Sequence, residues 1–321
     1  MAATLQIMDK PKFTTVTRTQ GNNEAVKNGT VKPRTFDFEF VEVDPLIAAF
    51  RRMVRGLEFD VCEMALTTYI AAREHGTQFT AIPVFLVRAF HHSAILHNVN
   101  AGIHSPKDLE GRRVGVNRGY TVTTGVWARS VLQHQYGVDL RKITWVLSGD
   151  EHVAQYRPPA NVVPIESGRK MADMLASGEL PAAIGVEIDH PDVRPLVPYG
   201  LDAGLQALRT LGHYPINHTI VIRGALLEAR PELAAEVFDA FAAAKRLYLE
   251  RLRSGAIANP SKVDEVHRRV TEITGDPLPY GIEPNRRVLE ELVQSAREQG
   301  IITRAVALED LFARGTHDLV A

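Results

Sequence analysis

Two histidines that are far apart in the sequence are the residues best suited to move protons. His92 follows an apolar run that ends near residue 87, and His218 lies within another apolar run at residues 215–224. An imidazole has an unperturbed pKa of about 6.5, so it can donate or accept a proton near neutral pH. Glu63 ends a third apolar run and could orient an imidazole or accept a proton from a phenol. These three are the candidate catalytic residues.

Each candidate also has a structural interpretation. His218 could be a buried, hydrogen-bonded histidine within a strand, and Glu63 could be an acidic residue at a helix N-terminus. Side chains alternate along a strand, so His91 and His92 would point to opposite faces and at least one of them is structural.

Arginines and hydroxyl residues at expected loop positions could bind carboxylates. Arginine binds a carboxylate through two parallel N–H groups, and a helix N-terminus offers free backbone N–H groups. The predicted substrate-binding residues are Arg18, Arg88, Arg118, Tyr120, Thr121, Thr123, Thr124, Ser167 and Arg169. Glu187 is a weaker candidate. A surface arginine or a helix-capping hydroxyl is the alternative for members of this set.

No metal or nucleotide cofactor is expected. The 12 histidines include no H-x-x-x-H or H-E-x-x-H spacing, and the single cysteine, Cys62, has no partner for a multi-cysteine zinc site. The stretch VGVNRGYTVTTG matches neither a Walker pattern nor G-x-G-x-x-G, which argues against a phosphate-containing cofactor.

Composition restricts the class of protein. The chain has 321 residues, 37 basic and 38 acidic side chains and 45% hydrophobic residues, so one large α/β unit or two compact units are expected. This charge balance argues against a nucleic-acid partner. No signal peptide or membrane span is recognisable, so we expect a cytoplasmic protein. Whether copies associate as a homo-oligomer is left open.

Strand and helix patterns alternate through most of the chain. Strands are expected at residues 4–8, 36–43, 59–64, 79–87 (with a break at Pro83), 111–116, 143–147, 162–166, 182–186 and 215–224. Helices are expected at residues 45–56, 64–76, 122–137, 168–180, 231–252 and 288–300. Asp44 is expected to cap the helix at residues 45–56, and Pro45 is expected to be the first residue of that helix. Alternation of this kind implies crossover connections and a largely parallel sheet.

Several stretches resemble a known family. IHSPKDLEGRRVGV and ESGRKMADMLASGELPAAI are similar to the second lobe of a type II periplasmic-binding-protein fold. EFDVCEMALTTYI, FTAIPVFLVRAFHHSAI, YPINHTIVIR and PYGIEPNRRVLEEL resemble the 4,5-dihydroxyphthalate decarboxylase family, which comprises cytoplasmic enzymes built on that fold. The resemblance covers nearly the whole chain except residues 20–35 and 148–162.

The resemblance implies an α/β fold of two lobes with mixed, mostly parallel sheets and flanking helices. Residues 1–97 and 211–321 would form the first lobe and residues 98–210 the second, with a ligand cleft and hinge between them. It also favours His92 over His91, because the family's functional-looking histidine precedes a serine.

The implied reaction is cofactor-independent decarboxylation of a hydroxylated aromatic dicarboxylate such as 4,5-dihydroxyphthalate. Direct loss of CO2 would leave an aryl anion that the ring cannot stabilise, so the carboxyl-bearing carbon must be protonated first, helped by a para hydroxyl. This chemistry needs an acid, a base and cationic clamps. The alternatives are a non-catalytic binding protein for a small aromatic carboxylate, and a different lyase on the same fold, such as a chorismate-dehydrating enzyme.

Overall fold

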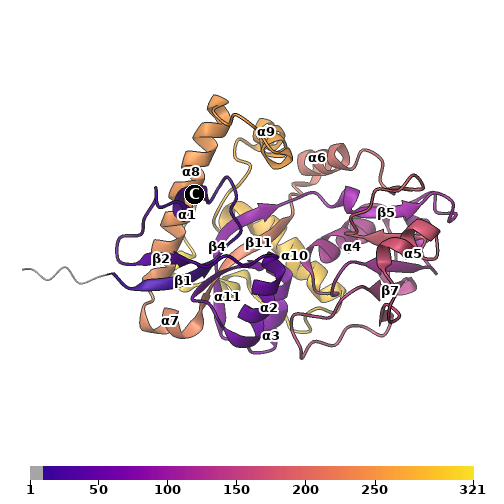
Figure 1. The fold of residues 1–321 in the computed structure, drawn as a ribbon, viewed down its shortest axis with the longest axis horizontal. Helices are drawn as coiled ribbons and strands as arrows, with labels where there is room; N and C mark the ends of the chain where they lie inside the picture. Colours follow the sequence, from indigo (N-terminus) through magenta and orange to yellow (C-terminus); the bar gives the residue numbers. More distant parts are fainter. Residues whose placement is uncertain (1–9) are drawn as a thin grey trace, which may run out of the picture.

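A computed structural model describes residues 10–321 and shows two β-sheets flanked by helices (Figure 1). Neighbouring strands in the first sheet follow the order β2-β1-β3-β11-β4, and those in the second sheet follow β10-β5-β9-β6-β7-β8. Both sheets mix parallel and antiparallel pairs. The α/β class predicted from the alternating pattern is therefore confirmed. The strand predicted at residues 4–8 lies outside the described residues.

The first sheet takes its strands from both ends of the chain. They are β1 (Lys12–Val16), β2 (Asp37–Phe40), β3 (Val61–Ala65), β4 (Phe79–Arg88) and β11 (Ile216–Arg223). The helices that connect or follow these strands are α1 (Glu24–Lys27), α2 (Leu46–Gly56), α3 (Leu66–Glu74), α7 (Gly224–Ala229), α8 (Leu233–Ser254), α9 (Lys262–Thr274), α10 (Arg286–Glu298) and α11 (Leu308–Leu311).

The second sheet is built from the middle of the chain. Its strands are β5 (Ile95–Asn98), β6 (Arg113–Val116), β7 (Thr144–Leu147), β8 (Val162–Pro164), β9 (Ala182–Ile184) and β10 (Val193–Pro195). Helices α4 (Thr123–Tyr136), α5 (Met171–Ser177) and α6 (Gly200–Leu211) accompany them. The exact division into lobes at residues 97 and 211 stays a prediction.

Apolar composition explains which strands lie at the centre. All five residues of β3 are buried, and β3 lies between β1 and β11 in the middle of the first sheet. Parallel pairing of β1 with β3 places Val16 beside Cys62, whereas antiparallel pairing of β11 places His218 beside Ala65 and Ile216 beside Arg88. The ends of β1, β3 and β4 and the start of β11 therefore share one edge of the sheet.

Some local predictions were wrong. β4 continues through Pro83, because β4 is an edge strand, where a residue without an N–H group can be accommodated. Its pairing with β11 is nevertheless irregular there, since Ile82 pairs with Ile220 and the next paired residue is Val87, with His218. Pro45 is the extended residue before α2 rather than the first residue inside it, and the helix is followed by Leu57 in the left-handed region (φ 48°). The short strand β1 was not predicted, nor were α6 and α9.

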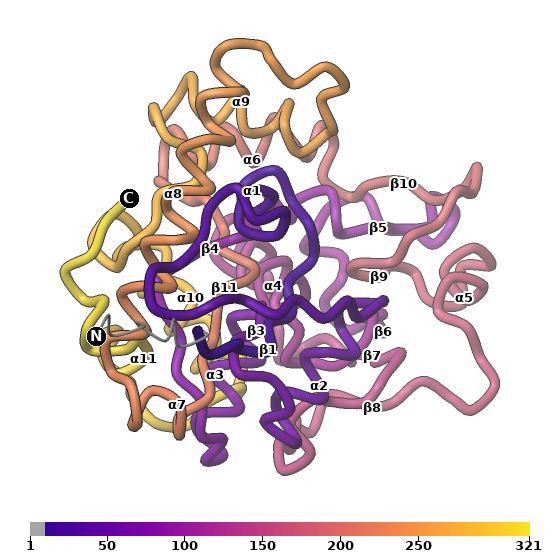
Figure 2. The backbone as a smooth tube through the Cα atoms, turned by 60° about the vertical axis from the view of Figure 1, so that its left-hand side comes forward, coloured from indigo at the N-terminus to yellow at the C-terminus, as the bar shows by residue number. Residues whose placement is uncertain are grey.

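The segment that carries α1 packs against the long helix α8, as Figure 2 shows. Glu24 of α1 forms an ion pair with Arg251 of α8 (2.8 Å). Just before α1, any side chain at Gly21 would collide with the ring of Tyr248, so only glycine lets this loop approach the helix so closely. The loop after β1 is therefore fixed against α8.

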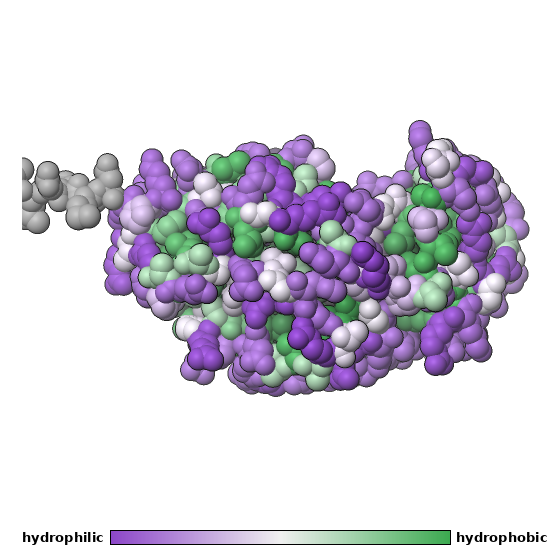
Figure 3. All heavy atoms as spheres, turned by 90° about the horizontal axis from the view of Figure 1, so that it is seen from below, coloured by the Kyte–Doolittle hydropathy of each residue, from purple (hydrophilic) through white to green (hydrophobic). Residues whose placement is uncertain are grey.

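The outer surface is predominantly polar, with apolar residues gathered in smaller patches on the face seen in Figure 3. None of the helices within residues 10–321 combines the length and the apolar character that crossing a bilayer requires.

Candidate active site

The edge of the first sheet brings Glu63 and His218 together, although 155 residues separate them in the sequence. Oε1 of Glu63 lies 2.7 Å from Nδ1 of His218. Glu63 is fully buried, whereas 18% of the His218 side chain is exposed. A carboxylate at Nδ1 accepts the hydrogen of that nitrogen, which leaves Nε2 as the free proton-transfer position. His218 Nε2 has no hydrogen-bond partner within residues 10–321 and keeps some accessible surface.

The loop after β1 completes the environment of Glu63. The backbone N–H of Arg18 donates to Oε2 of Glu63 (2.9 Å), and Nε2 of Gln20 lies 3.5 Å from Oε1. The guanidinium of Arg18 is exposed and makes no hydrogen bond or ion pair with the described residues. The Arg18 side chain is therefore available to a ligand, while its backbone holds the carboxylate of the pair.

A cavity of about 520 Å³ adjoins this pair. Arg18 and Gln20, which touch Glu63, line it, and so do Val87 and Arg88 at the end of β4 and residues of α8 and α9. Its volume falls in the range of about 300–1,000 Å³ that small-molecule pockets occupy. Glu63 and His218 are not among its lining residues, and the loop of Arg18 and Gln20 connects the cavity to the pair.

Arg88 lines the same cavity but is held differently from Arg18. Its side chain is buried, donates to Oδ1 of Asn285 (2.9 Å) and to the carbonyl of Tyr214 (2.8 Å), and stacks on the Tyr214 ring. Burial lowers the pKa of Arg88 to about 10. No carboxylate forms an ion pair with it within residues 10–321, and its Nε is buried without a partner. Part of Arg88 is therefore structural, and only Nε is unengaged.

Within residues 10–321, His92 forms neither a hydrogen bond nor a ring–ring contact with His218. Its ring is fully buried, with Nε2 2.7 Å from the amide oxygen of Gln135 and the ring of His213 at 6.2 Å. Burial lowers the pKa of His92. His91 is buried too and lies 3.1 Å from Oδ1 of Asn217. The expectation that the two histidines point to opposite faces of a strand fails, because both follow β4 and are buried.

The turn before α4, which includes Tyr120 and Thr121, belongs to the part of the chain that forms the second sheet, and we predicted that it binds an anion. Glu151 occupies part of it: its carboxylate accepts hydrogen bonds from the N–H of Tyr120, the N–H of Thr121 (3.2 Å) and the hydroxyl of Thr121 (2.6 Å). These donors are therefore not free for a substrate, contrary to our expectation. The loop of Glu151 is one of the segments outside the family resemblance, which is why the sequence did not reveal this contact.

Thr123 is also engaged. Its hydroxyl accepts from the N–H of Thr67 (3.1 Å), and the Thr67 hydroxyl donates to the carbonyl of Thr121 (2.6 Å). These bonds join the start of α3, next to the first sheet, to the start of α4, next to the second. Thr123 therefore connects the two sheets.

Arg118 and Thr124 remain accessible. Together with Asn117, Gly185 and Glu187 they line a cavity of about 310 Å³ at the N-terminus of α4. The guanidinium of Arg118 makes no bond to any described residue, and its backbone lies in the left-handed region (φ 71°). This is the second-sheet surface best suited to an anion.

The remaining predicted clamp lies apart from both cavities. Ser167 is exposed, and the Arg169 guanidinium forms an ion pair with Glu179. Helix α5 starts only at Met171, so neither residue lies at its first helical position. Their role in substrate binding stays a prediction without support from the geometry.

Several residues near the pair escaped the sequence analysis. The ring of Phe50 packs edge-on against His218 at 5.2 Å and near His152 at 6.3 Å. Residues before His152 bind α2: Asp150 pairs with Arg51 (2.8 Å), and the carbonyl of Glu151 accepts from Arg55 (2.9 Å). The only signal in the sequence was the position of Phe50 on the apolar face of a predicted helix, which by itself indicates core.

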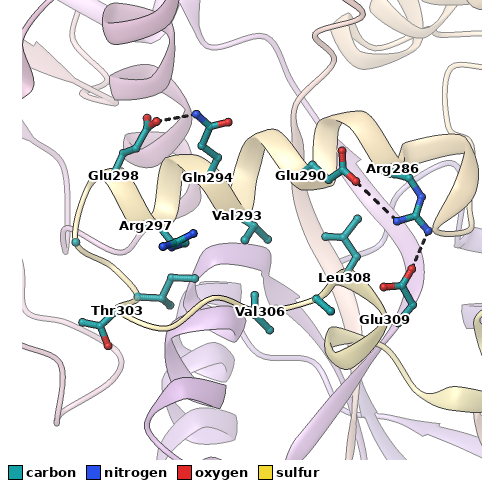
Figure 4. Close-up of a pocket in the computed structure, with 13 residues that line it drawn as sticks. Arg286, Glu290, Val293, Gln294, Arg297, Glu298, Thr303, Val306, Leu308 and Glu309 are labelled. Carbon is teal, nitrogen blue, oxygen red and sulfur yellow. Dashed lines mark hydrogen bonds and ion pairs between the residues drawn. The ribbon is translucent and has the colours of Figure 1, made fainter.

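A larger hollow than the cavity beside Glu63 lies elsewhere. A groove of about 960 Å³ runs between α10 and residues 300–309, and none of the predicted site residues lines it. Figure 4 shows Arg286 paired with Glu290 and Glu309 and Gln294 bonded to Glu298, while Arg297 has no such contact among the residues drawn. We therefore place the candidate site at the smaller cavity beside Glu63. No cluster of three potential metal ligands occurs within residues 10–321.

Comparison with known proteins gives a consistent family and fold. Residues 53–250 match the family model described as NMT1/THI5 like. A 4,5-dihydroxyphthalate decarboxylase of Comamonas testosteroni is 30% identical over 302 residues, covering 89% of this chain and 91% of the relative. A protein of the same name from Pseudomonas putida is 36% identical over 167 residues, covering 49% of this chain and 64% of the relative.

Two solved structures share the fold. One is the desulfurization enzyme DSZB in complex with biphenyl-2-sulfinic acid (TM-score 0.53, 14% identity, 95% of this chain and 96% of that one). The other is the periplasmic aliphatic sulphonate binding protein SsuA of Escherichia coli (TM-score 0.51, 13% identity, 97% of this chain and 100% of that one). The predicted type II periplasmic-binding-protein fold is thereby confirmed.

Proposed function

We propose that this chain, a member of the NMT1/THI5-like family, is a cofactor-independent decarboxylase of a hydroxylated aromatic dicarboxylate. The chain also belongs to the family of the 4,5-dihydroxyphthalate decarboxylases. The observation that carries this proposal is the Glu63–His218 pair, a buried carboxylate that orients an imidazole beside a cavity of suitable size. We further propose that it acts in the cytoplasm.

The reaction on 4,5-dihydroxyphthalate follows from the position of the pair. Nε2 of His218, when protonated, gives its proton to the ring carbon that carries one carboxylate, and the hydroxyl para to that carbon supplies electron density. The bond to the carboxylate then breaks, CO2 leaves, and the electron pair returns to the ring. The product is 3,4-dihydroxybenzoate, in which a hydrogen has replaced the lost carboxylate.

Glu63 and Arg18 support this step. The Glu63 carboxylate holds the Nδ1 hydrogen of His218 and stabilises the positive imidazole that donates the proton. The free guanidinium of Arg18 is placed to bind the carboxylate that the product retains. A catalytic role of His92 stays a prediction, and its burial against Gln135 favours a supporting role.

A direct assay tests the proposal. Purified protein is mixed with 4,5-dihydroxyphthalate near pH 7, and CO2 and ring absorbance are followed. Phthalate is the control ligand, because it lacks the para hydroxyl and should release no CO2. Binding of 4,5-dihydroxyphthalate without CO2 release would reject the enzyme and support the alternative of a non-catalytic binding protein.

A further inference from the structure

The cavity beside Glu63 is also lined by three polar residues of α8 and α9 that the reaction above does not use. Tyr248, Asp264 and His267 contribute to its wall, together with Arg18 and Arg88. His267 and Tyr248 are buried residues, with 5% and 3% of their surface exposed. The two arginines offer only hydrogen-bond donors, so the acceptors of the cavity come from other residues, and these three lie on the side formed by α8 and α9.

Hydrogen bonds connect the three residues in a fixed order. The Tyr248 hydroxyl lies 2.6 Å from Oδ1 of Asp264 and 2.7 Å from Nδ1 of His267. Oδ2 of Asp264 accepts from the N–H and the hydroxyl of Ser261, at 2.7 and 2.8 Å, in the cap of α9. Asp264 is thus fixed on one side by the helix cap and on the other by Tyr248.

The direction of these bonds follows from counting hydrogens. Burial opposes ionisation of Asp264, but hydrogen bonds from Tyr248 and Ser261 outweigh it and hold its pKa below the usual value. The ionised carboxylate can only accept, so Tyr248 gives its single hydrogen to Asp264. The short contact with His267 therefore requires Nδ1 to donate to the Tyr248 oxygen.

This order fixes the state of the other imidazole nitrogen. Burial lowers the pKa of His267 to about 4, so the ring is neutral near pH 7 and carries one hydrogen, on Nδ1. Nε2 is then a bare acceptor. It has no hydrogen-bond partner within residues 10–321 and keeps accessible surface.

We propose that Nε2 of His267 binds a ring hydroxyl of the aromatic acid and so selects hydroxylated ligands over those that lack the hydroxyl. The proposal deepens and rests on the proposed function, since it assigns the hydroxyl end of the ligand to α9 and its carboxylate end to Arg18. A bare lone pair repels a second carboxylate but accepts an O–H group. A hydroxyl that donates to Nε2 also becomes more electron-rich, as the para position requires.

Calorimetric titration with two product-like acids tests this assignment without turnover. The probes are 3,4-dihydroxybenzoate and benzoate, and the measured quantity is the ratio of their dissociation constants. We expect the wild-type protein to prefer the hydroxylated acid by about tenfold, the effect of one or two buried hydrogen bonds. His267→Asn can keep a donor toward Tyr248, but its shorter side chain has no acceptor at the position of Nε2, so it should bring the ratio close to one while leaving the benzoate affinity within about twofold.

Two further variants make the test independent of folding. Tyr248→Phe removes the acceptor for the Nδ1 hydrogen, so the His267 ring no longer has a fixed tautomer and the ratio should fall to an intermediate value. His104→Asn, an exposed histidine far from this cavity in the sequence and outside its lining, should retain the wild-type ratio.

The outcomes separate this inference from the proposed function. An unchanged ratio in His267→Asn, an equal loss of both affinities, or no preference in the wild type would overturn the role of His267 even if CO2 release is found. A collapse of the ratio in a protein that releases no CO2 would support the hydroxyl site and reject the decarboxylase.

Discussion

His218 and His92 are the same type of residue in two different surroundings. His218 faces the carboxylate of Glu63 through Nδ1 and leaves Nε2 accessible, whereas His92 faces the neutral amide of Gln135 through Nε2 and its Nδ1 is buried without a partner. A carboxylate fixes the tautomer and stabilises a positive ring, and an amide oxygen fixes only the tautomer. The partner of the imidazole, rather than the imidazole itself, therefore distinguishes a site for proton transfer from a site for packing.

The largest expected effect lies in turnover. His218→Asn and Glu63→Gln should each lower the rate of CO2 release from 4,5-dihydroxyphthalate by about 10²–10⁴-fold, because one removes the proton donor and the other its orienting carboxylate. His92→Asn should leave the rate within a few fold. Steady-state assays of the three variants, with circular dichroism as a check of folding, compare the two histidines directly.

The contrast between the two histidines would be contradicted if His92→Asn loses as much activity as His218→Asn while remaining folded. That result would restore His92 as the second proton-handling residue predicted from the sequence. Normal turnover in Glu63→Gln would show instead that the carboxylate only supports the sheet edge.

A second effect concerns stability in acid. Burial lowers the pKa of His91 to about 4 and also lowers that of His92, so the folded protein binds fewer protons than the unfolded chain below about pH 6.5. The free energy of unfolding should therefore fall as the pH drops from about 6.5 to 4, by at most about 1.4 kcal/mol per pH unit for each histidine. His91→Asn and His92→Asn should each make this decline shallower.

Urea unfolding at pH 7, 6 and 5 measures this decline. Parallel curves for the wild type and both variants would show that neither histidine is held neutral by burial.

The smallest effect should be seen in ligand affinity. Arg18→Ala should weaken binding of 3,4-dihydroxybenzoate by roughly 1.5–3 kcal/mol, the value of a hydrogen bond to a charged group. It should leave the melting temperature nearly unchanged, since the guanidinium has no partner among residues 10–321. Arg169→Ala is a matched control, because that arginine is also exposed but is paired with Glu179.

Equal effects of the two arginine substitutions would place the carboxylate outside the cavity beside Glu63. The His218 surroundings would then no longer be the substrate-binding part of the molecule.

The sequence predicted the parts of the site that depend on strand ends. Glu63 and His218 each lie near the end of an apolar run, and strand pairing then brings them to one sheet edge. The contact between Glu151 and Thr121 could not be predicted, because a loop without periodicity carries the carboxylate. The order Asp264, Tyr248, His267 depends on how α8 and α9 pack, which no spacing along the chain specifies.

The outer edge of β4 limits how copies of this chain can assemble. The chain's own C-terminal region already pairs with this edge, since Ala313 donates its N–H to the carbonyl of Ala81 and Gly281 donates to that of Pro83. Pro83 itself has no hydrogen to offer. These contacts oppose extension of the first sheet across β4 by a strand of a second molecule, so a dimer would use side-chain surfaces or another sheet edge, such as β2. The same contacts with the C-terminal region oppose aggregation through the exposed backbone of β4, a strand of ten mostly buried residues.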